Sequence, residues 1–156
     1  MKLTGVWLVH LATFIATAGA MIHVAAVFGG PSWYAFFGAP PVIVTSAQAG
    51  TWLAPVSALV TAVLMTTCSL YAASAAGLVR RLPLLRLGLV SMAVVCIARG
   101  LLLPAAALSH PELLNTFEIV SAFIWFVAGM GFAVGIRISR AKPDNSSKPT
   151  LLRGAT

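Results

Sequence analysis

"LLNTFEIVSAFIWFVAGMGFAVGI", residues 113–136, is an unbroken apolar run that contains one charged side chain, Glu118. A helix of about 20 apolar residues is long enough to cross the hydrocarbon core of a bilayer. Backbone N–H and C=O groups in lipid must bond within their own segment, and an α-helix satisfies them all. The run therefore predicts a transmembrane helix.

Three further runs have the same character, at residues 5–28, 52–78 and 84–107. The 156-residue chain is 60% hydrophobic and 8% charged, whereas soluble domains carry about 25% charged residues. Short connections make consecutive helices antiparallel neighbours. We therefore predict an all-α fold, a transmembrane up-down four-helix bundle over residues 1–137, with an aromatic outer loop between its first two helices. Residues 138–156 are predicted to form a flexible, basic cytoplasmic tail.

The distribution of basic residues predicts the orientation of this bundle. The net charge is +7, but Lys and Arg lie between or after the apolar runs and form no folded basic face, so nucleic acid is not an expected partner. The 29–51 connection is uncharged, whereas the 79–86 connection holds three arginines and the tail is basic. The positive-inside rule then places both termini in the cytoplasm and residues 29–51 outside.

The outer loop contains the stretch "GGPSWYAFFGAPP", residues 29–41. Pro31 suits the first turn of a short helix, predicted over residues 32–37. The two adjacent prolines that follow would end this helix and start another, which would end near residues 48–50.

The aromatic side chains of this loop suit a membrane interface. Trp and Tyr favour that position because their rings are apolar while their N–H and O–H groups stay wet. Trp33 and Tyr34, with Phe36 and Phe37, are therefore expected to form a flap over the mouth of the bundle. Two interpretations stay open: an anchor that fixes helix depth, or a lid over a ligand or partner site.

End signals mark the connection between the third and fourth helices. Pro104 predicts the end of the third helix. Residues 109–112, Ser-His-Pro-Glu, fit a capping box that would start the fourth. The turn is then centred at residues 108–109.

Two charged side chains lie inside the predicted spans. Arg99 precedes the predicted turn centre by nine or ten residues, and Glu118 follows it by the same number. At equal rise per residue the two would lie at the same depth, in the outer half of the bilayer. A lone charge at the bilayer centre costs about 2.5–3.5 kcal/mol, so a salt bridge is expected.

Further polar residues are expected near this pair. His23 is one to two turns from the outer boundary of the first helix, and Asn115 shares the face of Glu118. The pair is either a structural ion pair that fixes the register of the two helices or a site for a ligand, a proton or an anionic headgroup. The candidate ligand-binding residues are His23, Trp33, Tyr34, Arg99, Asn115 and Glu118.

Three stretches carry a family resemblance: "GGPSWYAFFGAPP", "AQAGTW" at residues 47–52 and "VRRLPLLRLGL" at residues 79–89. Together they resemble uncharacterised small four-helix inner-membrane proteins of Gram-negative bacteria, over about residues 20–105. The resemblance implies a bacterial inner membrane and four spans, and it implies no activity and no functional residues.

The motifs of common enzymes are absent. The sequence has no Gly-rich phosphate loop, no HExxH, no Gly-x-Ser-x-Gly and no metal-ligand spacing, so no cofactor and no metal are predicted. We expect a non-enzymatic membrane protein that binds a small or lipid-like ligand, or serves as an accessory subunit, through an outward-facing polar pocket. Its expected partners are membrane lipids and a membrane protein or a second copy. Two alternatives remain: a protein that protects against a periplasmic toxin, and a small membrane enzyme using His23 and Glu118 as acid and base.

Overall fold

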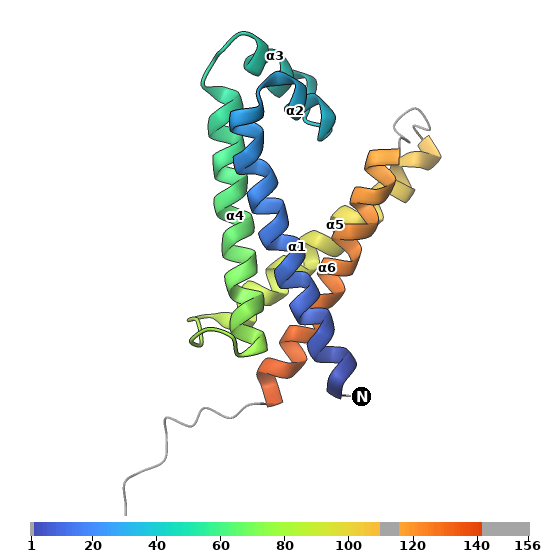
Figure 1. Cartoon of the computed structure of the whole chain (residues 1–156). Helices are drawn as coiled ribbons and strands as arrows, with labels where there is room; N and C mark the ends of the chain where they lie inside the picture. Colours follow the sequence, from blue (N-terminus) through green and yellow to red (C-terminus); the bar gives the residue numbers. More distant parts are fainter. Residues whose placement is uncertain (1, 110–115, 142–156) are drawn as a thin grey trace, which may run out of the picture.

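The computed structural model describes residues 2–109 and 116–141 (Figure 1). Within these residues every regular element is a helix. The four long helices are each long and apolar enough to cross a membrane, so the chain is a multi-pass membrane protein with the predicted all-α fold. The helices are α1 (Lys2–Gly29), α2 (Pro31–Phe36), α3 (Pro41–Gln48), α4 (Leu53–Ala76), α5 (Leu85–Ser109) and α6 (Thr116–Ala141).

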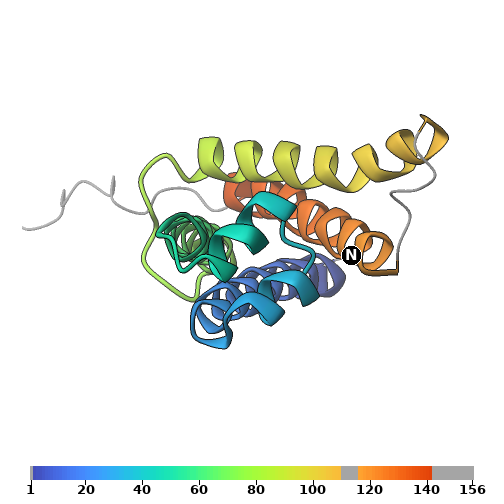
Figure 2. The same cartoon turned by 90° about the horizontal axis from the view of Figure 1, so that it is seen from above.

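The long helices form two hairpin-like pairs. α1 packs along α4, α5 packs along α6, and α1 also contacts α6. The two pairs diverge toward the end of the molecule that carries α2 and α3 (Figure 1). Seen from above, α2 and α3 lie over α1 and α4 (Figure 2). We call α2 and α3 the cap, the end that carries them the cap end, and the opposite end the basic end.

The helix interfaces are built from small residues. Ala12 and Ala16 of α1 and Ala62 of α4 are buried, whereas Trp7 and Phe14 of α1 are 64% and 70% exposed. Apolar attraction does not drive association between helices in lipid, and small side chains let backbones approach and gain packing contacts. The large apolar side chains on the outer surface suit contact with acyl chains.

The buried side chains form two separate clusters. The main cluster joins all four long helices and lies toward the basic end: Val9, Ala12, Ala72, Ala75, Leu85, Leu89, Ala93, Cys96, Ala128 and Phe132. The cap cluster joins α1, α2 and α4: Ala26, Tyr34, Ala54 and Ala58. Because the cap cluster contains no residue of α5 or α6, the α5–α6 pair is held to the rest chiefly at the basic end.

The backbones of α1 and α6 lie close together at Gly131. A Cβ atom placed there would lie 2.5 Å from the carbonyl oxygen of Leu8 and 2.6 Å from the Cβ of Ala12. No side chain larger than hydrogen fits at such a distance without a backbone shift. Gly131 therefore fixes how α6 docks on α1.

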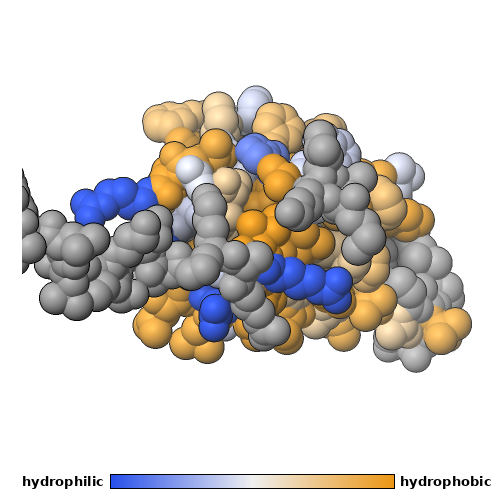
Figure 3. Space-filling view, turned by 90° about the horizontal axis from the view of Figure 1, so that it is seen from below, coloured by the Kyte–Doolittle hydropathy of each residue, from blue (hydrophilic) through white to orange (hydrophobic). Residues whose placement is uncertain are grey.

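Polar contacts add further ties between elements. The hydroxyls of Thr17 in α1 and Ser69 in α4 are hydrogen-bonded at 2.7 Å. At the basic end, a terminal N–H of Arg81 donates to the carbonyl of Ser139 in the last turn of α6, at 3.2 Å. A cation suits the carbonyl end of a helix. Hydrophilic side chains lie among hydrophobic ones at this end (Figure 3).

The two short cap helices confirm their prediction from the proline and glycine pattern. Pro31 and Pro41 lie in the first turns of α2 and α3, where a missing N–H costs no helical hydrogen bond. Gly30 and Gly38 have φ values of 73° and 69°, in the left-handed region that glycine adopts without steric cost.

The third long helix does not end near Pro104 as predicted, because α5 continues to Ser109. Pro104 cannot donate a helical hydrogen bond. In lipid, however, ending the helix there would leave several backbone groups unpaired, so the loss of one bond within the helix is the smaller cost. The predicted capping box falls largely on residues 110–115, outside the described residues.

The fourth long helix continues to Ala141, so residues 138–141 of the predicted tail are helical. The remainder of the predicted tail also lies outside the described residues.

Candidate functional site

Arg99 of α5 and Glu118 of α6 form the salt bridge that the sequence predicts. A terminal N–H of the Arg99 guanidinium, at Nη2, donates to Oε2 of Glu118 at 3.3 Å. The two side chains are 44% and 24% exposed on the surface of the chain. A charged pair thus lies within the spans with part of its surface accessible.

The premise that the two residues lie at equal depth is wrong. Gly100 faces Ala122 and Phe126, and Gly129 faces Cys96 and Ile97. These facing pairs place Arg99 level with about residue 125 of α6, so the backbones of Arg99 and Glu118 are offset by about seven residues, or about 10 Å along the helix axis.

The physical reason for this offset is that α5 continues past Pro104 to Ser109, so residues 108–109, the predicted centre of the turn, are helical. The bridge still forms because the long arginine side chain can carry its charged head along the helix surface, away from its own Cα.

Most N–H donors of the Arg99 guanidinium have no acceptor among the described residues. The guanidinium carries five N–H groups, and among the described residues only one hydrogen bond engages it, the bond to Glu118. Four N–H groups therefore have no acceptor within residues 2–109 and 116–141. Unpaired polar groups at membrane depth are costly, so this side chain suits an acceptor-rich ligand.

His23 lies at the depth of Glu118 but does not join the salt bridge. The contacts of Gly131 with Leu8 and of Gly5 with Val134 set the register of α1 against α6. Followed at about 1.5 Å per residue, this register brings Glu118 level with about residues 21–23. The His23 ring is half-buried, and α1 and α6 diverge at this level (Figure 1).

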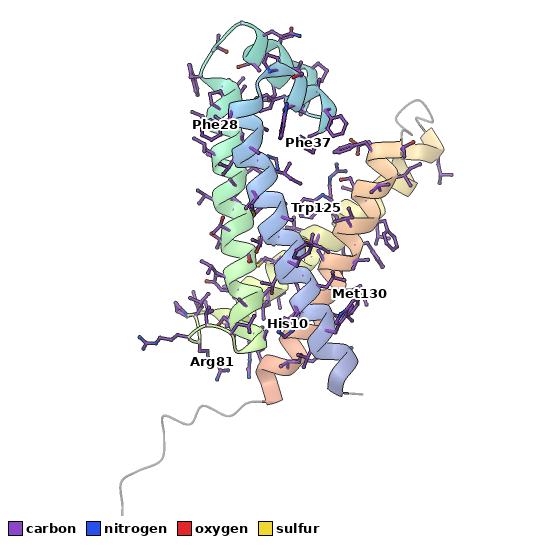
Figure 4. All side chains as sticks on the ribbon, viewed as in Figure 1. His10, Phe28, Phe37, Arg81, Trp125 and Met130 are labelled. Atoms are coloured by element: carbon purple, nitrogen blue, oxygen red, sulfur yellow. The ribbon has the colours of Figure 1, made fainter. Side chains whose placement is uncertain are left out.

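Trp125 of α6 lies between the main cluster and the region where α1 and α6 diverge. It is half-buried on α6 and packs against the main cluster. Figure 4 shows it between α1 and α6, below the cap. Trp125 follows Glu118 by seven residues, two helical turns, so an aromatic side chain lies on the same face of α6 about 10 Å toward the basic end.

Trp33 and Tyr34 differ sharply in their surroundings. Trp33 is 44% exposed and makes an edge-to-face contact with Phe37, with ring centroids 5.9 Å apart. Tyr34 is only 6% exposed and belongs to the cap cluster. Its hydroxyl is buried and has no hydrogen-bond partner among the described residues.

The expectation that the hydroxyl of Tyr34 stays wet is therefore wrong. The reason lies in the small side chains of Ala26, Ala54 and Ala58, which leave room for the ring to pack against α1 and α4. This burial raises the pKa of Tyr34, so its hydroxyl stays protonated and remains a donor.

The connection between α2 and α3 contacts α6 at Gly38, and sequence reasoning missed this contact. A Cβ atom placed on Gly38 would lie 2.7 Å from the ring of Phe117. Phe117 directly precedes Glu118, so the cap touches α6 beside the ion pair. Figure 4 shows Phe37 on the same side of the cap, toward α6. A glycine between two short helices, with an aromatic residue at the start of a span, was the available signal.

The remaining candidates add little to this geometry. Asn115 lies outside the described residues. Within residues 2–109 and 116–141, no group of three His, Cys, Asp or Glu side chains could hold a metal ion. The site consists of the Arg99–Glu118 pair, with Phe117 beside it at the cap and His23 at its depth.

Fold and site together define a class: a four-span membrane protein with an ion pair in the half of the bundle toward the cap. Comparison with protein-family models, curated proteins and solved structures finds no match.

Proposed function

We propose that this chain is a multi-pass protein of the bacterial inner membrane whose cap end faces outward and binds an acidic, lipid-like molecule through Arg99. The observation that carries the proposal is a guanidinium inside a span, four of whose N–H groups have no acceptor within residues 2–109 and 116–141. Its fold suits a binding or accessory role in the membrane.

The chemistry of Arg99 favours an anion. A planar guanidinium presents paired N–H groups that match the oxygens of a phosphate or carboxylate, and such charge-assisted bonds are short and strong. Without ligand, the Glu118 carboxylate neutralises the positive charge at 3.3 Å. An incoming acidic group would take up the spare donors and compete with Glu118.

The surroundings of the pair favour a ligand with an apolar part. Trp125 lies two helical turns from Glu118 toward the basic end and packs against the main cluster, and α1 and α6 diverge toward the cap end. An acyl chain could lie against these surfaces without losing its apolar environment. A membrane phospholipid with an acidic headgroup has both properties.

The orientation rests on charge. Arg80, Arg81 and Arg86 lie at or next to the α4–α5 connection, and Arg137 lies near the end of α6, whereas residues 29–51 are uncharged. By the positive-inside rule the basic end faces the cytoplasm. A reporter fused at the C-terminus should therefore be active only in a cytoplasmic assay, and one inserted at Gly38 only in a periplasmic assay. Activity of the C-terminal fusion in the periplasm would contradict the proposed orientation.

The binding proposal is tested by the lipids that copurify with the protein in mild detergent. We expect acidic phospholipid to be retained by the wild type and lost from Arg99→Gln, measured by mass spectrometry of the extracted lipids. Arg86→Gln is the matched control, because it removes the same charge from an exposed position near the start of α5. Equal retention by Arg99→Gln and Arg86→Gln would refute the site.

A further inference from the structure

Helix α2 is a short segment between two glycines in the left-handed region. It has six residues, and Tyr34 is the one buried side chain it contributes. Gly30 before it and Gly38 after it have φ values of 73° and 69°. Because glycine moves between backbone regions at little cost, the chain can change direction at both ends of α2.

The other half of the cap is fixed to the bundle. Ser46 of α3 is buried, and its hydroxyl accepts the N–H of Ala54 in α4 at 3.0 Å. The same hydroxyl is hydrogen-bonded to the Thr51 hydroxyl at 2.6 Å. For α2, no side-chain hydrogen bond to another element is present within the described part of the chain. The cap therefore has a tied half, α3, and a half held by apolar contacts, α2.

Tyr34 both favours and opposes the closed position of α2, in which its ring is buried in the cap cluster. Its ring packs among Ala26, Ala54 and Ala58, which favours the closed position. Its buried hydroxyl finds no acceptor in the described part of the chain, which opposes that position. Buried tyrosines usually pair their hydroxyl, as Tyr71 does by donating to the carbonyl of Pro83 at 3.2 Å. Withdrawal of Tyr34 to the membrane interface would let its hydroxyl meet water or lipid oxygens.

We propose that α2 is a lid that swings about Gly30 and Gly38, drawing Tyr34 out of the cap cluster while α3 stays tied to α4. This motion breaks the contact between Gly38 and Phe117 and uncovers α6 beside Glu118. The lid rests on the proposed function in one respect: it gives the acidic ligand a route to the ion pair.

Amide hydrogen exchange at Ala39 reports the opening directly. The N–H of Ala39 lies beyond the Gly38 hinge and bonds to the carbonyl of Tyr34 in α2 at 2.9 Å, so the swing of α2 breaks this bond and exposes the N–H to exchange. In neutral phosphatidylcholine nanodiscs without added ligand, Tyr34→Phe should slow this exchange about tenfold, because the closed state no longer buries an unpaired donor. Tyr71→Phe is the matched control, and it should leave exchange at Ala39 unchanged.

The hinge is tested by a second matched pair of variants. Gly30 and Gly50 both have positive φ, 73° and 66°, and an added Cβ would meet no atom within 4 Å at either position. Alanine at either site therefore introduces backbone strain without a clash. Gly30→Ala should speed exchange at Ala39 about tenfold by straining the closed lid. Gly50→Ala, which lies in the tied half, should not.

Faster or unchanged exchange in Tyr34→Phe would overturn the lid, and so would equal effects of Gly30→Ala and Gly50→Ala. Because no ligand is added, this result is independent of the binding proposal. If the exchange pattern appears while lipid retention does not depend on Arg99, the lid stands and the proposed function fails.

Discussion

Arg99→Leu and Glu118→Leu should each lower the free energy of unfolding in detergent by about 3 kcal/mol, and the double replacement should recover most of that loss. Each single change removes one member of the ion pair at 3.3 Å and leaves the other charge within the spans, where an isolated charge costs about 2.5–3.5 kcal/mol. Replacing both partners of an ion pair by apolar residues is often close to neutral. The measurement is a double-mutant cycle of reversible unfolding.

Arg86→Leu and Arg137→Leu are suitable controls for this cycle, because both arginines are exposed and lie toward the basic end. Each should cost well under about 1 kcal/mol, as is usual for exposed positions away from special contacts. Additive losses at Arg99 and Glu118 would show that the 3.3 Å contact does not couple them in the membrane protein.

Gly131→Ala should destabilise the bundle by about 1–3 kcal/mol despite the better helix propensity of alanine. The added methyl would lie 2.5 Å from the carbonyl oxygen of Leu8, so α1 and α6 would have to separate. Thermal unfolding in the same detergent measures the loss.

Gly135→Ala provides the matched comparison on the same helix. Its added methyl would lie 3.4 Å from the Cβ of Ala75, an ordinary contact. It should therefore be neutral or stabilising by up to about 1 kcal/mol. If the two variants behave alike, the docking of α6 on α1 is not set by Gly131.

The apolar runs and the proline and glycine signals made most of the fold predictable. Hydrogen bonding in lipid leaves the helix as the only choice for each span, and Pro31 and Pro41 mark the first turns of the cap helices. The same rules failed at Pro104. A proline that ends a helix in water is tolerated within a span, because ending the helix there would leave more backbone groups unpaired.

The salt bridge was predictable, although Arg99 and Glu118 do not lie at the equal depth from which it was predicted. Charge cost alone is enough to pair Arg99 with Glu118, since each is the nearest opposite charge available within a span. Their depths depend on where the turn falls, and that position depended on the length of α5. The length of the arginine side chain allows the contact despite the offset.

The position of Tyr34 could not be derived from residue preference. Trp33 and Tyr34 have the same preference for the interface, but only Tyr34 faces the small residues Ala54 and Ala58. Which of two adjacent aromatic side chains turns inward depends on the exact direction of a short helix. That direction is set by Gly30 and Gly38 and by contacts remote in sequence, such as that with Phe117.

The central claim, that Arg99 binds an acidic lipid-like molecule, is tested most directly by native mass spectrometry with added ligand. Three forms are compared: the wild type, Glu118→Gln, and the double variant Arg99→Gln/Glu118→Gln. Each is titrated with phosphatidylglycerol, with phosphatidylcholine and with inorganic phosphate.

We expect phosphatidylglycerol to bind the wild type in preference to phosphatidylcholine, and to bind Glu118→Gln about tenfold more tightly because the competing carboxylate is gone. The double variant should lose this preference. Binding of inorganic phosphate as tight as that of phosphatidylglycerol would identify a soluble anion as the ligand instead of a lipid. Unchanged preference for phosphatidylglycerol in the double variant would contradict the account.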